Sequence, residues 1–306
     1  MNITIGTRGS KLALWQAQFI SDKLIGAGII TEIKVIKTTG DKILNVAMSK
    51  VGSKGIFTEE LEHALVKGEI DIAVHSAKDM PSELPEEFEL IAFSERERVN
   101  DVVVTHQKNF NWEKEGMVLG TSSTRRKALL KHYYPHIATI DIRGNLQTRI
   151  RKMEEGQCDG LILDFAGVHR MNYDKLIYKE LDFREFVPAV GQGSIVIECH
   201  ADLNEEKRSN IRNVINHRLT EISILTERSF LKRLQGGCSI PAFAYANLDG
   251  EMLYIEGGII SLDGSSLIKL EMSDIPENAL TLGNKLGATV LSNGGEEILS
   301  EIRNQN

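Results

Sequence analysis

The chain has 306 residues, 42% hydrophobic and 26% charged, and its formal net charge is −7. This length predicts two or three domains, and the negative net charge argues against nucleic acid as a partner. We expect neither a membrane span nor a signal peptide, because no run of 18 apolar residues occurs and the N-terminus has no basic region. Three cysteines at uneven spacing do not predict a disulfide framework, so a cytoplasmic location is expected.

Strand-like and helix-like patterns alternate over the first 94 residues. Apolar residues recur at helical spacing from Ser10 to Leu24, and Ser10 is the expected N-cap. Thr58 precedes two glutamates, which predicts a helix start with a capping hydroxyl. Strands are expected at residues 3–5, 32–38, 70–74 and 90–93.

A second unit runs from about residue 101 to 187. Helices are expected after Ser123 and from Asn145, and the expected strands are residues 102–104, 118–120, 137–142 and 161–163. This alternation predicts an α/β fold with mainly parallel sheets covered by helices. Two crossings, near residues 94–100 and 188–193, would link two lobes and leave a cleft between them.

The last third of the chain predicts a small α+β domain. A strand at residues 194–199 is followed by a helical pattern at 204–234 with a break in it. Three strands at 242–248, 252–260 and 266–272, joined by Asp-Gly turns, precede a helix at 278–293. The predicted domains are residues 1–96 plus 191–213, residues 97–190, and residues 214–306.

Polar residues gather at strand ends and helix starts, where open α/β sheets bind ligands. His75, Ser76, Lys78 and Asp79 follow a buried strand and form a plausible acid–base group, although an ordinary turn with solvated charges explains them equally well. Two further stretches combine hydroxyls, amides or glycine with arginines suited to carboxylates or phosphates. They contain Thr121, Ser122, Ser123, Arg125 and Arg126, and Arg143, Gly144, Asn145 and Arg149. Capped helices with solvated basic faces are the alternative for both.

Cys238 lies in a glycine loop, Gly236-Gly237-Cys238, between a predicted helix and a predicted strand. A thiolate in an exposed loop can be a nucleophile or an attachment point. Cys158 and Cys199 are interpreted as structural. No Cys/His pattern with metal spacing occurs, so no metal site is predicted, and Gly52-Ser53-Lys54-Gly55 lacks the full phosphate-loop spacing.

A basic set at loops indicates a positive cleft for a polyanionic small molecule, since the rest of the chain must be correspondingly acidic. Its members are Arg8, Lys50, Lys54, Lys78, Arg125, Arg126, Arg143 and Arg149.

Seven segments in this order resemble the porphobilinogen deaminase (hydroxymethylbilane synthase) family over almost the whole chain. They are residues 5–17, 51–57, 73–79, 120–123, 143–145, 188–193 and 236–238. The resemblance implies two lobes like those of periplasmic binding proteins and a third small domain. It also implies a dipyrromethane cofactor joined through a thioether to Cys238. The enzyme would add four porphobilinogen molecules to this primer with loss of ammonia, then release linear hydroxymethylbilane by hydrolysis, in tetrapyrrole and heme biosynthesis.

The resemblance also implies roles for single residues. Asp79 matches the catalytic carboxylate, which would help ammonia leave and stabilise a cationic azafulvene intermediate. Lys50 and Lys54 match lysines near the cofactor, and Gln192 and Gly193 match a crossing near the site that would act as a hinge. The expected carboxylate-binding residues are Arg8, Ser10, Arg125, Arg126, Arg143 and Arg149, assisted by Lys78 and Thr121 to Ser123. We expect a monomer with no nucleic-acid or membrane partner.

The sequence departs from the family pattern at Ser53, where glycine is usual, and at Asp164, where a small apolar residue is expected. A carboxylate facing the cleft at Asp164 would repel the substrate, whereas one turned aside would cap the next helix. Two other functions stay open from the residues alone. One is a non-catalytic two-lobed module that binds anions, and the other is a different transferase with Cys238 as nucleophile, for which no neighbouring histidine is evident.

Overall fold

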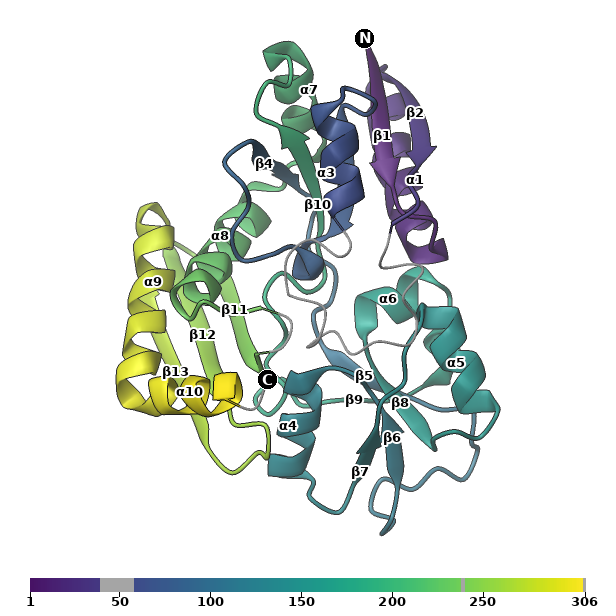
Figure 1. Cartoon of the computed structure of the whole chain (residues 1–306), viewed down its shortest axis with the longest axis vertical. Helices are drawn as coiled ribbons and strands as arrows, with labels where there is room; N and C mark the ends of the chain where they lie inside the picture. The colour runs from purple at the N-terminus through teal and green to yellow at the C-terminus, as the bar shows by residue number, and fades with distance from the viewer. Residues whose placement is uncertain (39–57, 238–239, 305–306) are drawn as a thin grey trace.

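The structure, a computed structural model, describes residues 1–38, 58–237 and 240–304, and its strands form three sheets (Figure 1). We call the first sheet and its helices lobe 1. Its strands in spatial order are β2 (Ile30–Val35), β1 (Asn2–Thr7), β3 (Ile72–Ser76), β10 (Ile195–His200) and β4 (Phe88–Phe93). Its helices are α1 (Lys11–Gly26), α3 (Glu59–Val66), the 3-10 turn η1 (Ala77–Asp79) and α7 (Glu205–Ile215).

Lobe 2 is built on the second sheet. Its strands in spatial order are β7 (Ala138–Ile140), β6 (Val118–Gly120), β8 (Gly160–Asp164), β5 (Asp101–Val104) and β9 (Ile177–Glu180). Its helices are α4 (Thr124–Tyr133), α5 (Leu146–Glu154), α6 (Phe165–Arg170) and the 3-10 turn η2 (Asp174–Leu176).

The two lobes share one strand topology. In each described sheet a strand that follows a crossing, β10 or β5, runs antiparallel to both of its neighbours, and the other pairings are parallel. The remaining strands of each sheet therefore point the same way and bring their carboxyl ends to one edge. The predicted α/β fold with mainly parallel sheets is confirmed, and each sheet contains one antiparallel strand that enters it directly after a crossing.

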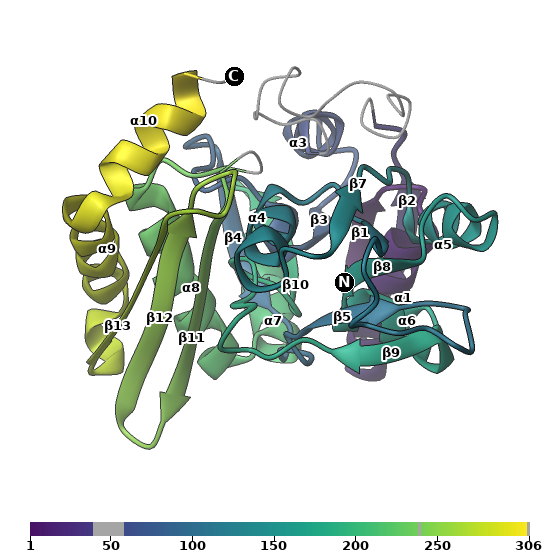
Figure 2. The ribbon, with the colours of Figure 1, turned by 90° about the horizontal axis from the view of Figure 1, so that it is seen from below.

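A C-terminal unit lies beside both lobes (Figures 1 and 2). Its antiparallel sheet contains β11 (Ala242–Asp249), β12 (Met252–Ile260) and β13 (Leu267–Asp274). Its helical segments are α8 (Arg218–Arg233), η3 (Pro276–Asn278), α9 (Ala279–Val290), a π turn (Leu291–Gly295) and α10 (Glu296–Asn304). The expected turns form, because Gly250 and Gly264 supply the positive φ that each requires.

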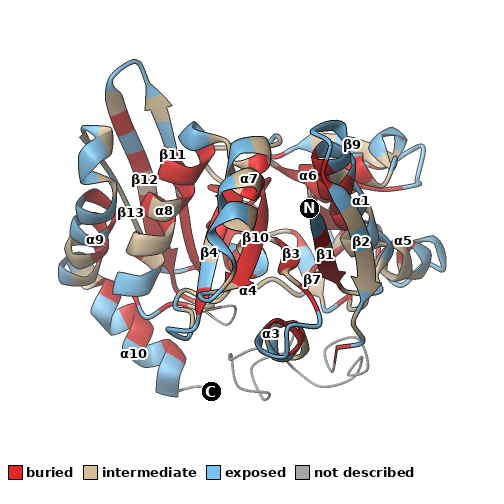
Figure 3. Cartoon of the chain, turned by 90° about the horizontal axis from the view of Figure 1, so that it is seen from above, coloured by how far each residue is buried: buried red, intermediate tan, exposed pale blue. Residues whose placement is uncertain are grey.

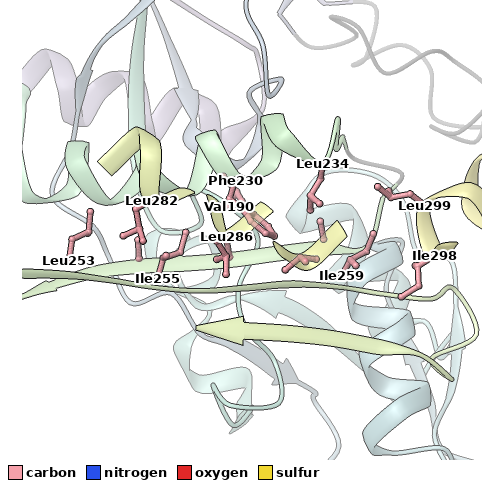
Figure 4. Close-up of a cluster of buried hydrophobic side chains, with 14 of the residues drawn as sticks. Val190, Phe230, Leu234, Leu253, Ile255, Ile259, Leu282, Leu286, Ile298 and Leu299 are labelled. Carbon is pink, nitrogen blue, oxygen red and sulfur yellow. The ribbon is translucent and has the colours of Figure 1, made fainter. Parts of the chain in front are cut away.

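The core of the C-terminal unit is apolar and reaches into the crossing between the lobes. Phe230 of α8, Ile255 and Ile259 of β12 and Leu286 of α9 are buried together, and Val190 of the second crossing joins them (Figure 4). In lobe 1 the first five residues of β10 are all buried (Figure 3). Phe243 of β11 and Ile260 of β12 are buried instead with Phe186, which follows β9 of lobe 2, so apolar burial also holds the unit against that lobe.

The two crossings between lobes 1 and 2 are tied to each other. Glu97 on the first crossing donates its backbone N–H to Gly193 O at 3.0 Å, and Gln192 Nε2 donates to Val99 O at 2.6 Å. Gly193 has φ +95, and a Cβ there would lie 2.5 Å from Glu97 O. Only glycine adopts this positive φ without strain and has no Cβ to collide with Glu97 O, so the two crossings can approach this closely.

Glu227 of α8 fastens both crossings to the C-terminal unit. Its buried carboxylate accepts hydrogen bonds from Arg96 Nη1 at 2.5 Å, from the Gly191 N–H at 2.8 Å and from the Ala246 N–H at 2.8 Å. Arg96 belongs to the first crossing, Gly191 to the second and Ala246 to β11. One side chain thus joins three segments distant in sequence.

Several expected elements differ in detail. Thr58 precedes α3, but its side chain makes no capping hydrogen bond, so that part of the prediction is wrong. Strand β2 begins and ends earlier than the expected 32–38. The expected break at residues 204–234 falls between α7 and α8 and is confirmed. Helix α10 was not predicted; non-helical angles at Asn293 and Gly294 separate it from α9.

Candidate active site

The carboxyl end of β3 carries Ser76, Lys78 and Asp79. Gln16 of α1 donates from Nε2 to Ser76 Oγ at 2.8 Å, and the Ala77 N–H donates to Ser194 O at 3.0 Å. These bonds fix the η1 turn against α1 and the second crossing. Asp79 is exposed at the end of this turn and has no ion-pair partner among the described residues.

His75 lies one step earlier, inside the sheet. Its Nε2 is 2.9 Å from Glu198 Oε2 of β10, and both side chains are buried. In this structure His75 therefore belongs to a buried pair that joins neighbouring strands, and it is not part of the exposed group formed by Lys78 and Asp79. Its predicted binding role stays a prediction.

Lobe 2 presents the predicted hydroxyls and amides at helix starts. Ser123 Oγ caps α4 by accepting from the Arg126 N–H at 3.4 Å, and Asn145 Oδ1 caps α5 by accepting from the Thr148 N–H at 2.9 Å. Ser122 Oγ donates to Ile142 O at 3.0 Å and Thr121 Oγ1 accepts from the Ser123 N–H at 3.3 Å. The two caps are local and follow from residue type and spacing, which is why the sequence predicts helix starts here, whereas the bond from Ser122 joins residues 20 apart.

Glycine shapes the second of these helix starts. Gly144 has φ +114, and a Cβ there would lie 2.7 Å from the Thr148 methyl group. Arg149 Nε donates to Gly144 O at 2.8 Å. Burial lowers the pKa of Arg149 and the charge of Arg126 adds to this, whereas Asp164 and Asp79 oppose it. The charges of Arg149 and Asp79, from opposite lobes, therefore act on each other.

Arg125 and Arg126 are buried and share one carboxylate, that of Asp101. Arg125 Nη2 lies 2.6 Å from Asp101 Oδ2, and Arg126 Nη2 lies 2.7 Å from Asp101 Oδ1. Gln192 Nε2 donates to the same Oδ1 at 2.9 Å. Asp101 thus holds both arginines and Gln192 of the second crossing, and the predicted contact of the two arginines with a ligand stays a prediction. Sequence analysis missed Asp101, which begins an apolar strand and gives no local signal.

Burial alone would raise the pKa of Asp101, but Arg125 and Arg126 lower it to about 2. The carboxylate therefore stabilises the fold above its unfolded-state pKa of about 4, and this stabilisation disappears as the pH falls through about 2. We expect the difference in unfolding free energy between wild type and Asp101→Asn to be constant near neutral pH and to shrink between about pH 4 and pH 2. Urea unfolding over this range measures it. A difference that stays constant down to the lowest pH would contradict the assignment.

One ion pair spans the two lobes. Lys78 Nζ of lobe 1 donates to Asp164 Oδ1 of lobe 2. Asp164 also caps α6 by accepting from the Gly167 N–H at 2.7 Å, so the two alternatives left open for it, a place at the lobe junction and a helix cap, occur together. Burial would raise the pKa of Asp164, but Lys78 and Arg126 lower it far below its ordinary range.

Arg170 of α6 is a second link between the lobes, and sequence analysis missed it. Its Nη2 donates to Gly193 O at 2.7 Å, and its guanidinium lies 5.5 Å from the ring centre of Trp15 in α1. Burial lowers its pKa, against the charges of Asp164 and Glu97. We define the interlobe cluster as the charged residues Lys78, Asp79, Arg126, Arg149, Asp164 and Arg170.

Of the remaining predicted residues, some lie in the described part of the chain and others do not. Arg8 and Arg143 are half-buried and follow β1 and β7, and Ser10 caps α1 by accepting from the Ala13 N–H at 3.2 Å. Gly193 lies in the second crossing. Lys50, Lys54 and Cys238 lie outside the described residues.

The loop that contains Cys238 is anchored next to the site. It connects α8 to β11, as expected, and Gly236 O accepts from Ser82 Oγ at 3.0 Å. Ser82 is three residues beyond Asp79. The described part of the loop is therefore fastened to the segment that follows the exposed carboxylate.

Comparison with known proteins extends this description. The chain is a two-lobed α/β protein with a charged interlobe site and a small C-terminal unit. The family model described as porphobilinogen deaminase, dipyromethane cofactor binding domain, matches residues 3–208, and the model of the C-terminal domain of porphobilinogen deaminase matches residues 222–292. The chain belongs to the porphobilinogen deaminase family. The predicted family, its transferase class and its dipyrromethane cofactor are confirmed.

Relatives match over nearly their full length. The porphobilinogen deaminase of Desulfosudis oleivorans is 52% identical, with 100% of this chain and 99% of the relative covered. That of Cytophaga hutchinsonii is 49% identical, with 98% and 97% covered. Among solved structures, the methionine-binding protein MetQ has a TM-score of 0.44 and 11% identity, covering 70% of this chain and 89% of its own.

The residues present fit an anionic two-ring cofactor. The Nε atoms of Arg125 and Arg126 are buried and have no hydrogen-bond partner in the described structure, and the same holds for Gln192 Oε1. Buried polar groups without partners are rare in folded proteins. Two guanidinium donors left in this state match the carboxylates that a dipyrromethane carries. In the described residues no helix is long and apolar enough to cross a membrane, and no metal-binding group of His, Cys, Asp or Glu occurs.

Proposed function

We propose that this chain is a hydroxymethylbilane synthase. It condenses four porphobilinogen molecules, one at a time and with loss of ammonia, onto a covalent dipyrromethane primer, and then releases linear hydroxymethylbilane by hydrolysis. The observation that carries this proposal is the full-length family match together with a cationic cluster between the lobes. The alternative of a non-catalytic anion-binding module has no support in the comparisons.

Cations at the lobe junction suit this substrate. Each pyrrole unit carries an acetate and a propionate, so negative charge accumulates as the product grows. Guanidinium groups bind carboxylates through paired, charge-assisted hydrogen bonds, and helix N-termini add backbone donors. The proposed carboxylate-binding residues are Arg8, Ser10, Lys78, Thr121, Ser122, Ser123, Arg125, Arg126, Arg143, Gly144, Asn145 and Arg149, together with His75 and Ser76 as neighbours.

Asp79 is the proposed catalytic carboxylate. It is exposed at the end of a turn fixed by the hydrogen bonds of Ser76 and Ala77, so its position is set without its own side chain being engaged. A carboxylate held in this way stabilises positive charge as the amino group of porphobilinogen leaves as ammonia. The pyrrole N–H groups are the donors that it would accept from.

Cys238 is the proposed attachment point of the cofactor, through a thioether. When bound, the dipyrromethane supplies the free pyrrole carbon to which the first substrate unit is joined. Arg125, Arg126, Gln192, Lys50 and Lys54 would hold it in place. Support comes from the unpartnered buried donors of the two arginines and from the loop anchored at Ser82.

We propose three domains: residues 1–96 plus 191–213, residues 97–190, and residues 214–306. Each sheet draws its strands from one of these ranges.

We also propose that the protein is a monomer in the cytoplasm, without a nucleic-acid partner. Two buried free thiols, Cys158 and Cys199, agree with a reducing compartment. Light scattering of the purified protein measures its molar mass and so tests whether it is a monomer. Gly193 and Gln192 of the second crossing would act as a hinge between the lobes.

The intact mass of the purified protein tests the cofactor assignment directly. Wild type should be heavier than its sequence mass by one two-pyrrole unit, and Cys238→Ser should have its sequence mass, because a hydroxyl is a far weaker nucleophile than a thiolate. Cys158→Ser is the matched control and should keep the added mass. An unmodified wild type that gains no mass after incubation with porphobilinogen would refute the assignment.

A further inference from the structure

Asp164 is a carboxylate placed among cations that the proposed function assigns to the carboxylates of the substrate. It ends β8, and its register partner on β5 is Asp101, so the two carboxylates lie on the same face of the lobe 2 sheet. Asp101 is fully engaged by Arg125 and Arg126. Asp164 instead reaches out of lobe 2 to Lys78 of lobe 1.

The surroundings of Asp164 are cationic on both sides of the junction. Besides Lys78 and Arg126, its charge acts on Arg149 and Arg170. Both partners of the ion pair retain some solvent contact, with 24% of the Lys78 side chain and 20% of the Asp164 side chain exposed. An incoming anion can therefore reach the Lys78–Asp164 pair.

A carboxylate from solution that binds Lys78 competes with Asp164 for the ammonium group, because two carboxylates beside one ammonium group repel each other. We infer that Asp164 is an internal counterion that occupies the place of a substrate carboxylate beside Lys78 and is exchanged for it, so that Asp164 sets the affinity of the interlobe cluster for anions. This inference rests on the proposed function for the identity of the anion. It concerns binding, since Asp164 is argued to act through Lys78 and not on the reacting atoms.

The helix cap and the counterion can be separated by one substitution. Asparagine caps helices about as well as aspartate, so Asp164→Asn keeps the bond to the Gly167 N–H and removes only the charge. Asp174→Asn is the matched control. Asp174 follows α6 and pairs with His169 at 2.7 Å, and 46% of its side chain is exposed.

Two measurements test the inference. In turnover of porphobilinogen at low salt, Asp164→Asn should lower KM by about 3- to 10-fold with little change in kcat, and the gain should shrink as salt screens the added positive charge. In thermal unfolding with citrate, a tricarboxylate that does not react, the same variant should bind citrate about 3- to 10-fold more tightly than wild type. Asp174→Asn should match wild type in both.

A double-mutant cycle assigns the effect to the pair. In a Lys78→Gln background, Asp164→Asn should tighten citrate binding much less than it does in wild type, because the ammonium group that pairs with Asp164 is gone and only the surrounding arginines remain. Unchanged citrate affinity in Asp164→Asn, or an equal gain with and without Lys78, would overturn the inference. Absence of tetrapyrrole product from wild type would instead overturn the proposed function, and the citrate measurement would still decide the role of Asp164.

Discussion

Replacing Asp79 with asparagine should lower kcat for porphobilinogen by about 10²- to 10³-fold. Asparagine keeps the size of the side chain but removes the negative charge that would stabilise the cationic species formed as ammonia leaves. The fold should be unaffected, because Asp79 is exposed and has no ion-pair partner among the described residues. Steady-state turnover and thermal unfolding of the same preparation measure the two effects separately.

Glu83→Gln is the matched control for this experiment. Glu83 lies four residues further along the chain and forms an exposed ion pair with Lys232 at 3.0 Å. Glu83→Gln should leave kcat unchanged, because it removes a negative charge from the same segment but keeps the Asp79 carboxylate at the end of η1. Full activity in Asp79→Asn would show that the Asp79 carboxylate has no part in the mechanism.

Asp101→Asn should lower the free energy of unfolding by about 3–5 kcal/mol, the usual cost of leaving buried charges without their partner. The Asp101 carboxylate neutralises two buried guanidinium groups at once. In Asp101→Asn one carboxylate oxygen is replaced by an NH2 group, which places an N–H donor against one of the guanidinium groups. Gln192 would lose part of its anchorage as well. Urea unfolding at neutral pH, with the enzyme at fixed concentration, provides the measurement.

Asp182→Asn is the control for stability. Asp182 pairs with Arg184 at 2.8 Å, but 85% of the Arg184 side chain is exposed, so water replaces the lost partner. This variant should unfold at nearly the same urea concentration as wild type. If Asp101→Asn were as mild as this control, the view of Asp101 as the anchor of Arg125 and Arg126 would have to be abandoned.

Local features of this protein were predictable because neighbouring residues in the chain create them. Ser10, Ser123 and Asn145 cap helices through backbone groups three residues away, and the sequence predicted Ser10 as a cap and helix starts at the other two. The approximate positions of the strands were predictable as well, although their exact ends were not, and parallel strands bring their carboxyl ends to one edge. The family followed from seven short segments in a fixed order, and the comparisons confirm it.

The partners of the charged side chains were decided by the tertiary structure alone. Nothing in the sequence near Arg125 and Arg126 indicates that Asp101 neutralises both, 24 and 25 residues away. Lys78 and Asp164 are 86 residues apart and belong to different lobes, so only the packing of the two sheets brings them together. A basic residue in the sequence predicts affinity for anions, but whether a protein carboxylate already satisfies it depends on long-range contacts. The sequence by itself determined the family and the order of most helices and strands, whereas the fold decided which cations remain available to a ligand, because electrostatic partners are chosen by distance in space and not along the chain.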